Sequence, residues 1–215
     1  MTRLFALSEA LARAHTGTSE HAHAVAELAD RVGRRLGMNE PELRTLRWGA
    51  LLHDIGKIEV RREILNKPGP LTDAEFEEVK QHTVVGALMV ERVARFGRVH
   101  QLVRWSHERW DGDGYPDGLA GVAIPLGARV ICVCDAYDAM VSDRPYRSAM
   151  PLHAALVELR LGAGSQFDPD VVRVFLSLPE QTWENIRHNV AGARGSVNRS
   201  GPDGEETFVR EMMVN

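Results

Sequence analysis

The segment Leu51-Leu52-His53-Asp54-Ile55-Gly56-Lys57 ends a predicted helix with a histidine and an aspartate side by side. Leu43, Leu46 and Ala50 precede it at helical spacing and define the buried face of that helix. A histidine or an aspartate that is buried without a partner is costly. A bound cation would satisfy both side chains, and a helix-terminal pair with ordinary hydrogen bonds is the alternative that the dipeptide leaves open.

Helical periodicity continues from this segment in both directions along the chain. One predicted helix begins at a Thr18-Ser19 cap and ends at Gly37, and the next begins at Asn39 with Pro41. Thr72-Asp73-Ala74-Glu75 has the pattern of a capping box. The predicted helices cover residues 4–11, 18–36, 41–53, 72–93, 99–107, 127–140, 151–161, 169–178 and 180–190. No alternating strand pattern is present, so we expect an all-helical fold.

Three segments break this periodicity. Residues 58–71 are predicted to form a loop around Lys67-Pro68-Gly69-Pro70, and residues 110–127 a long, turn-rich one. Long loops inside a compact domain are uncommon and are often functional. Residues 191–204 are rich in Gly, Ser, Asn and Pro, which is typical of a disordered tail. We therefore expect one domain over residues 1–190 and a flexible tail over residues 191–215.

The composition is that of an ordinary soluble globular protein, with 44% hydrophobic and 26% charged residues in 215. The formal net charge of -4 gives no overall positive field. We therefore expect no nucleic-acid polymer as a partner, and an anionic ligand needs a local positive site. There is no signal-peptide core and no apolar stretch of membrane-spanning length. We expect a cytoplasmic protein with no membrane partner, in which Cys132 and Cys134 are buried free thiols.

Histidine outnumbers cysteine by 9 to 2, and histidine is the commonest metal ligand. The candidate ligands besides His53 and Asp54 come from other predicted helices or their ends: His21, His82, His107 and Asp135. Asp135 is the most informative, because an acid inside a nearly all-apolar helix needs a partner or a metal. Asp138 lies one turn on, on the same face. Four histidines and two aspartates suffice for two adjacent cations that share a carboxylate, and such ligands suit iron, manganese or zinc.

The long loop begins with acidic residues but does not fit a calcium-binding loop. After Asp111-Gly112-Asp113-Gly114, Tyr115 takes the next ligand position, and Pro116 stands where the turn glycine belongs. Val122 replaces the closing glutamate. Trp110 and Tyr115 are large aromatic residues in a glycine-rich connection, which is typical of a loop that orders around a ligand. A plain surface loop is the alternative.

Four segments follow one another in a specific order: His53-Asp54, Asp111-Gly112-Asp113-Gly114-Tyr115-Pro116, Asp135-Ala136-Tyr137-Asp138-Ala139-Met140 and Ser142-Asp143-Arg144-Pro145-Tyr146-Arg147. This set resembles the HD-GYP subfamily of the HD-superfamily phosphohydrolases, over residues 15–178. The resemblance implies an all-α bundle of roughly seven helices, whose long glycine-rich loop carries Gly-Tyr-Pro. It also implies a metal-dependent phosphodiesterase that hydrolyses cyclic di-GMP to linear pGpG and, in some members, to GMP. Some members of the subfamily prefer other cyclic dinucleotides.

The resemblance implies a ligand set for two divalent metal ions. Iron and manganese are the expected metals, and zinc is the alternative. The resemblance assigns one metal to His21, His53, Asp54 and Asp135. Asp54 then bridges to a second metal, which is held by His82 and His107. The subfamily position for a third metal is Gly17 here, so we expect no third ion.

The resemblance also implies a set of substrate contacts and shows one departure. Lys57, Arg144 and Arg147 match phosphate-contacting positions, and Gly114-Tyr115-Pro116 matches the segment that flanks the nucleotide. The subfamily has two consecutive histidines at the second metal, whereas this chain has Ser106-His107. We therefore expect the second metal to bind more weakly or not at all, with water or the serine hydroxyl in place of the missing imidazole.

The expected chemistry is in-line displacement at a phosphodiester. A hydroxide that bridges the two metals is the expected nucleophile, and Lys57 and Arg144 stabilise the charge that develops. Asp138 either orients a metal ligand or protonates the leaving oxygen.

Other functions and protein partners stay open at this point. An HD-type phosphohydrolase that acts on another nucleotide is one alternative, and a weakly catalytic module that binds a cyclic dinucleotide or a partner domain is another. A diguanylate-cyclase-domain protein, a receiver-domain protein and a second copy of the chain are the candidate protein partners. Because the chain begins shortly before His21, we expect regulation through expression, oligomerisation or a separate partner.

Overall fold

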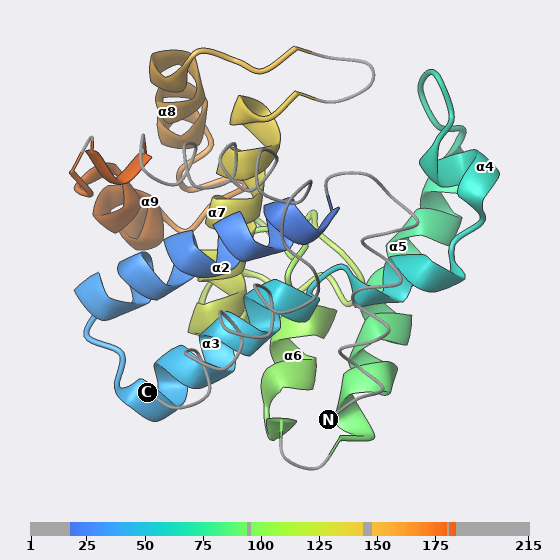
Figure 1. The fold of residues 1–215 in the computed structure, drawn as a ribbon, viewed down its shortest axis with the longest axis horizontal. Helices are drawn as coiled ribbons and strands as arrows, with labels where there is room; N and C mark the ends of the chain where they lie inside the picture. The colour runs from blue at the N-terminus through green and yellow to red at the C-terminus, as the bar shows by residue number, and fades with distance from the viewer. Residues whose placement is uncertain (1–17, 94–95, 144–147, 180, 184–215) are drawn as a thin grey trace, which may run out of the picture. The chain divides into compact units, whose positions relative to one another are not determined.

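The computed structural model describes residues 18–93, 96–143, 148–179 and 181–183, and these ranges are all-helical, as predicted (Figure 1). The α-helices are α2 (Thr18–Arg35), α3 (Glu40–Leu52), α4 (Arg62–Leu65), α5 (Asp73–Glu91), α6 (Val99–Arg104), α7 (Leu126–Val141), α8 (Leu152–Leu161) and α9 (Pro169–Leu176). Two 3-10 turns, η1 (Ile55–Glu59) and η3 (Gly121–Ala123), complete the described elements. None of the described helices is both long enough and apolar enough to cross a membrane.

The predicted helix ends are confirmed at the capping residues. Asn39 Oδ1 accepts a hydrogen bond from Glu42 N at 3.0 Å, and Glu42 Oε2 accepts one from Asn39 N at 2.8 Å. Thr72 and Glu75 form the same reciprocal box at the start of α5. An N-cap of this kind stabilises a helix by about 1 kcal/mol. Gly37 follows α2 with a φ of 79°, a left-handed conformation that glycine adopts without strain.

Three boundaries differ from the predictions. The predicted loop over residues 58–71 contains the end of η1 and the short helix α4, which buries Ile64 but is too short to show a periodic pattern. The helix predicted over residues 99–107 ends at Arg104, so His107 lies in the turn that follows it. The predicted loop over residues 110–127 contains η3 and the first two residues of α7. Three predicted segments lie wholly or partly outside the described residues. They are the helix over residues 4–11, the tail over residues 191–215, and the helix over residues 180–190, of which only residues 181–183 are described.

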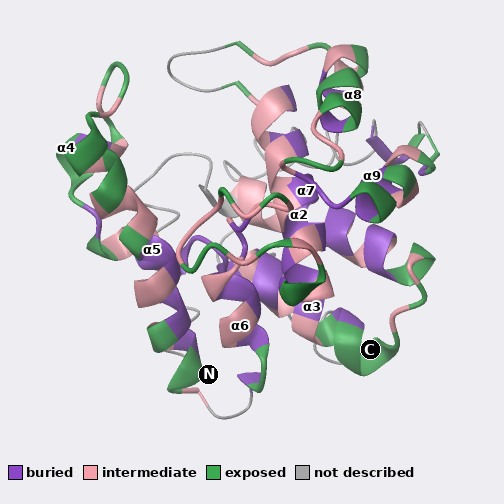
Figure 2. Cartoon of the chain, turned by 180° about the vertical axis from the view of Figure 1, so that it is seen from behind, coloured by how far each residue is buried: buried purple, intermediate pink, exposed green. Residues whose placement is uncertain are grey.

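The chain divides into two compact units, residues 1–177 and 178–215. In the first unit α2 packs along α3, α7 and α9, while α5 packs against α6 and η1 (Figure 1). Helix α3 also contacts α6 and α7, so it connects the two sets. Figure 2 shows the buried residues concentrated on α2, α3, α6 and α7, whereas α4 and α8 expose more of their surface. In the second unit, Thr182 N donates to Pro179 O.

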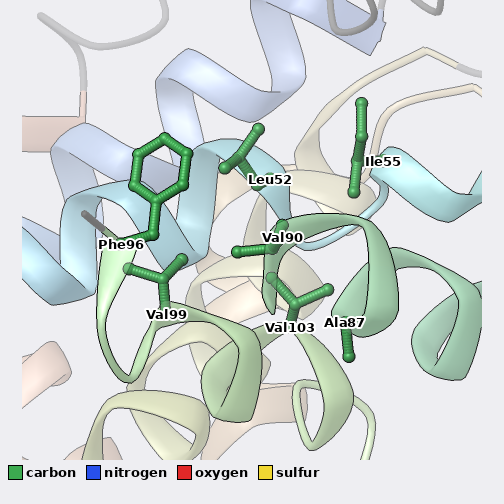
Figure 3. Packing of buried hydrophobic residues seen from close by; sticks show 7 residues of the cluster. All are labelled: Leu52, Ile55, Ala87, Val90, Phe96, Val99 and Val103. Carbon is green, nitrogen blue, oxygen red and sulfur yellow. The ribbon is translucent and has the colours of Figure 1, made fainter. Parts of the chain in front are cut away.

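A hydrophobic cluster fixes the end of α3 against α5 and α6 (Figure 3). Its buried members are Leu52, Ile55, Ala87, Val90, Phe96, Val99 and Val103. Full burial of one such side chain contributes about 1.5–3 kcal/mol, so the cluster is a rigid support. It holds Leu52 and Ile55, which flank the His53-Asp54 pair in the sequence.

Gly56 allows η1 to lie directly on α5. A Cβ atom at this position would come within 2.0 Å of the His82 carbonyl oxygen and 2.7 Å of Gly86 N. Any side chain here would push the two segments apart. The glycine therefore sets the approach of Asp54 to His82.

Candidate metal centre

Asp54 lies between two groups of potential metal ligands. One group consists of His21, His53 and Asp54, and the other of Asp54, His82 and His107. Within each group the ligand atoms lie within 4.8 Å of one another. Helix α2, the end of α3, α5 and the turn after α6 supply these side chains. Asp54 is common to both groups.

The two carboxylate oxygens of Asp54 face different groups. Asp54 Oδ1 lies 3.3 Å from His82 Nε2 and 3.8 Å from His107 Nε2. Asp54 Oδ2 lies 3.6 Å from His53 Nε2 and 2.5 Å from Lys57 Nζ. This geometry allows one carboxylate to bind two cations.

The imidazole rings of His53 and His82 are oriented by backbone carbonyls of their own helices. His53 Nδ1 donates to Ala50 O at 2.7 Å, and His82 Nδ1 donates to Val79 O at 2.6 Å. These bonds hold the proton on Nδ1 and leave Nε2 with a free lone pair that faces Asp54.

The atoms that face the centre of the site lack hydrogen-bond partners within the described residues. These buried atoms are His53 Nε2, Asp54 Oδ1, His82 Nε2 and His107 Nε2. Four orphaned, buried polar atoms in one place are costly, because buried polar groups are almost always paired. Divalent cations would satisfy all of them, so the residues fit a metal centre.

The charges in the site favour ionised Asp54 and neutral His82. Burial lowers the pKa of His82. Burial would raise the pKa of Asp54, but the positive charge of Lys57 and the neighbouring imidazoles outweigh it and hold this pKa well below its usual range. An ionised carboxylate and a neutral imidazole are the forms that bind divalent metals.

Two aspartates of α7 lie beside the first group, and both contact His21. Asp135 Oδ1 lies 3.1 Å from His21 Nε2 and 3.8 Å from His53 Nε2. Asp138 Oδ2 lies 2.6 Å from His21 Nδ1, on the other side of the ring. Burial lowers the pKa of His21, but the two carboxylates outweigh it and raise this pKa to about 10. His21 must therefore lose a proton before its Nε2 can bind a cation.

Ser106 is buried beside the second group, but its hydroxyl is already engaged. Ser106 Oγ donates to Val103 O at 3.0 Å. In this rotamer the serine fills the position of the expected histidine without adding a ligand. The second group therefore offers three protein ligands.

Replacing this serine should restore the missing ligand. Ser106→His is expected to raise the affinity of the second site for Mn²⁺ by roughly tenfold, equivalent to ~1.4 kcal/mol. Equilibrium dialysis with elemental analysis would give the affinity of each site. Ser165→His is a matched control, because Ser165 Oγ makes the same type of bond, to Gly162 O at 3.1 Å, on an exposed residue. Equal Mn²⁺ binding by Ser106→His and the unmodified protein would contradict the expectation that the missing histidine weakens the second site.

The Gly-Tyr-Pro segment lies against the second group. The Tyr115 ring stacks on the His107 ring with centroids 5.2 Å apart and an angle of 17°. Gly114 makes the approach possible, because a Cβ there would come within 2.3 Å of Arg109 N and 2.5 Å of Glu108 Cα. Arg144 and Arg147, the expected phosphate contacts, lie outside the described residues.

Glu108 holds this loop in place, and the sequence interpretation overlooked it. Its side chain is buried, with Oε1 accepting from Asp117 N at 2.7 Å and Oε2 from Leu119 N at 3.0 Å. The sequence does contain a signal for this role. Glu108 is an acid that follows the candidate ligand His107 at the start of a long loop, and the backbone N–H groups of such a loop need acceptors. Burial raises the pKa of Glu108.

Asp117 anchors the same loop from outside. Its carboxylate accepts two hydrogen bonds from Arg104, each 2.7 Å long, and a third from Trp105 Nε1 at 2.7 Å. The loop is thus tied to the end of α6 through both its backbone and its side chains.

A cavity of about 360 Å³ opens beside the second group. Its lining includes Phe76, Lys80, His107, Tyr115, Cys132 and Asp135. Phe76 and Lys80 come from α5 and were not among the predicted site residues. Both cysteines are free, but only Cys134 is buried as expected, because Cys132 is partly exposed at the cavity.

Known proteins resemble this chain in sequence. An HD domain family model matches residues 6–171. A cyclic di-GMP phosphodiesterase of Thermotoga maritima is 40% identical over 174 residues, which are 79% of this chain and 47% of that protein. The 3'3'-cGAMP-specific phosphodiesterase 3 of Vibrio cholerae is 37% identical over 175 residues, 80% of this chain and 38% of that protein. This chain therefore spans less than half the length of these relatives.

The fold has a counterpart among solved structures. A crystal structure of a cyclic GMP-AMP specific phosphodiesterase from Vibrio cholerae matches with a TM-score of 0.61 and 22% identity. The match covers 97% of this chain and 53% of that one. The helical arrangement described above is therefore shared with that protein.

Proposed function

Because the chain belongs to the HD domain family, we propose that it is a metal-dependent phosphodiesterase that hydrolyses a cyclic dinucleotide, with cyclic di-GMP as the substrate. The observation that carries the proposal is the position of Asp54, with one carboxylate oxygen toward each ligand group. The Thermotoga maritima relative supports the choice of substrate, because its name specifies cyclic di-GMP.

The proposed metal ligands are those that meet at Asp54. His21, His53, Asp54 and Asp135 would hold one cation, and Asp54, His82 and His107 the other. Two divalent cations bound there would neutralise charge on the phosphate oxygens and lower the pKa of a water molecule, and iron or manganese suits these ligands.

Lys57 supplies a positive charge next to the shared carboxylate. Its ammonium lies 2.5 Å from Asp54 Oδ2 and is partly exposed to solvent. From there it can donate to a phosphate oxygen as negative charge develops on it. Arg144 and Arg147 are proposed as further phosphate contacts on the strength of the motif that contains them.

Asp138 acts in our proposal by orienting His21. It is hydrogen bonded to His21 Nδ1 at 2.6 Å, which directs His21 Nε2 toward Asp135 and the centre of the site. Carboxylates in this position raise the basicity of a ligating imidazole and fix its orientation. This geometry favours orientation over the alternative role, proton donation to the leaving oxygen.

A hydrolysis assay tests the proposal. The purified chain, loaded with Mn²⁺ or Fe²⁺, is incubated with cyclic di-GMP, and the products are separated by anion-exchange chromatography. We expect linear pGpG, alone or together with GMP, and no product after chelation. Intact cyclic di-GMP in the presence of bound metal would favour a binding module instead, and cleavage only of other nucleotides would favour the broader phosphohydrolase alternative.

A further inference from the structure

One wall of the cavity is formed by Phe76, Lys80 and Tyr115, and its two α5 side chains, Phe76 and Lys80, have no role in the chemistry derived so far. We propose that this wall binds a nucleobase of the substrate and prefers guanine to adenine, with the aromatic rings packing on the base and Lys80 donating to it. The inference rests on the proposed function, because it takes the ligand to be a nucleotide whose phosphate lies at the metal centre.

The wall extends outward from the metal centre through a series of ring contacts. Tyr115 stacks on His107, and its other neighbour is Phe76, with ring centroids 6.1 Å apart and an angle of 83°. Lys80 Nζ lies 4.8 Å from the centroid of Phe76 and 5.8 Å from that of Tyr115. A nucleotide with its phosphate near His107 can therefore place its base on these side chains.

Both α5 side chains are available to a ligand. Phe76 is 44% exposed although it lies at a cavity, so a stacked base would cover apolar surface that now faces water. The carboxylate partner of Lys80 is Glu77 Oε1 at 2.6 Å, and the Glu77 side chain is 65% exposed. An exposed pair of this kind contributes little, so the ammonium can turn to a ligand at small cost.

The donor pattern of Lys80 distinguishes the two purines. Guanine presents two neighbouring acceptors, O6 and N7, whereas adenine presents N7 next to the N6 amino donor. An ammonium has three donors and no acceptor, so it matches guanine and opposes the adenine amino group. Arg109, another basic residue of the cavity lining, is held by Asp111 through hydrogen bonds of 3.0 and 2.6 Å.

Binding of 5'-GMP and 5'-AMP tests the inference directly. Isothermal titration calorimetry in the presence of Mn²⁺ compares the unmodified protein with Lys80→Met, Phe76→Leu and Lys67→Met. Lys67→Met is the control, because it removes the same charge from a residue that precedes α5. Lys67 pairs with Glu75, and neither residue lines the cavity. We expect the unmodified protein and Lys67→Met to bind GMP about tenfold more tightly than AMP. Lys80→Met should bind both nucleotides equally, and Phe76→Leu should weaken both together.

Two results would overturn the inference. One is equal affinity of the unmodified protein for GMP and AMP, and the other is an equal loss of both affinities in Lys80→Met, which would assign the ammonium to the phosphate. Neither mononucleotide contains a bond for a diesterase to break. A failure of the proposed function would therefore appear as intact cyclic di-GMP in the hydrolysis assay, independently of the base preference.

Discussion

Asp54→Ala is expected to lose both cations and to reduce hydrolysis of cyclic di-GMP by more than about a thousandfold, because the ions that activate water are lost with their shared ligand. The remaining ligands would form two separate sets without a common carboxylate. Elemental analysis after dialysis gives the metal content, and the chromatographic assay gives the rate. Activity that survives in this variant would show that the site is assigned wrongly.

A control variant separates this effect from a general loss of one acidic residue. Asp170 is exposed in the first turn of α9 and pairs with Arg173 on the surface. Asp170→Ala should retain the metal content and the activity of the unmodified protein. Equal losses in both variants would point to unfolding, which circular dichroism would detect.

Glu108→Gln is expected to lower kcat/KM for cyclic di-GMP by roughly tenfold to hundredfold while both metals stay bound. In the glutamine variant an amino group would face the backbone N–H of Asp117 or Leu119. A buried donor left without an acceptor costs about 1–3 kcal/mol, which is equivalent to this range of rates. The loop that carries Tyr115 should then open, and the loss should appear mainly in KM.

Hydrogen exchange gives a second measurement for Glu108→Gln. Amides of residues 110–121 should exchange faster than in the unmodified protein, while those of α5 should not change. Glu158→Gln, on an exposed residue of α8, serves as the matched control. A fall in metal content that parallels the fall in activity would contradict the assigned role, because it would place Glu108 in support of His107 and not of the loop.

The candidate metal ligands could be picked out from the sequence because their chemistry conflicts with their surroundings. His53 and Asp54 end an apolar helix, and Asp135 lies inside another, so each indicates a partner that the helix itself does not provide. The orientation of the rings was not predictable. It depends on hydrogen bonds from His53 to Ala50 O and from His82 to Val79 O, which only the folded backbone defines.

Glu108, Phe76 and Lys80 were missed because their contacts leave no periodic pattern in the sequence. Glu108 binds backbone N–H groups of a loop whose path no spacing rule predicts. Phe76 and Lys80 are one turn apart on α5 and resemble an ordinary solvated helix face until Tyr115 is brought against them.

Helix α4 has four residues, which is too short for a periodic pattern. Ser106 was recognised as a departure, but its bond to Val103 O required the structure.

Anomalous diffraction from crystals grown with Mn²⁺ tests the central claim, which is that the two oxygens of Asp54 are shared between two cations. We predict two anomalous peaks. One should lie among His21, His53, Asp54 and Asp135, and a weaker one among Asp54, His82 and His107. A single peak, or two peaks that do not share Asp54, would contradict the account.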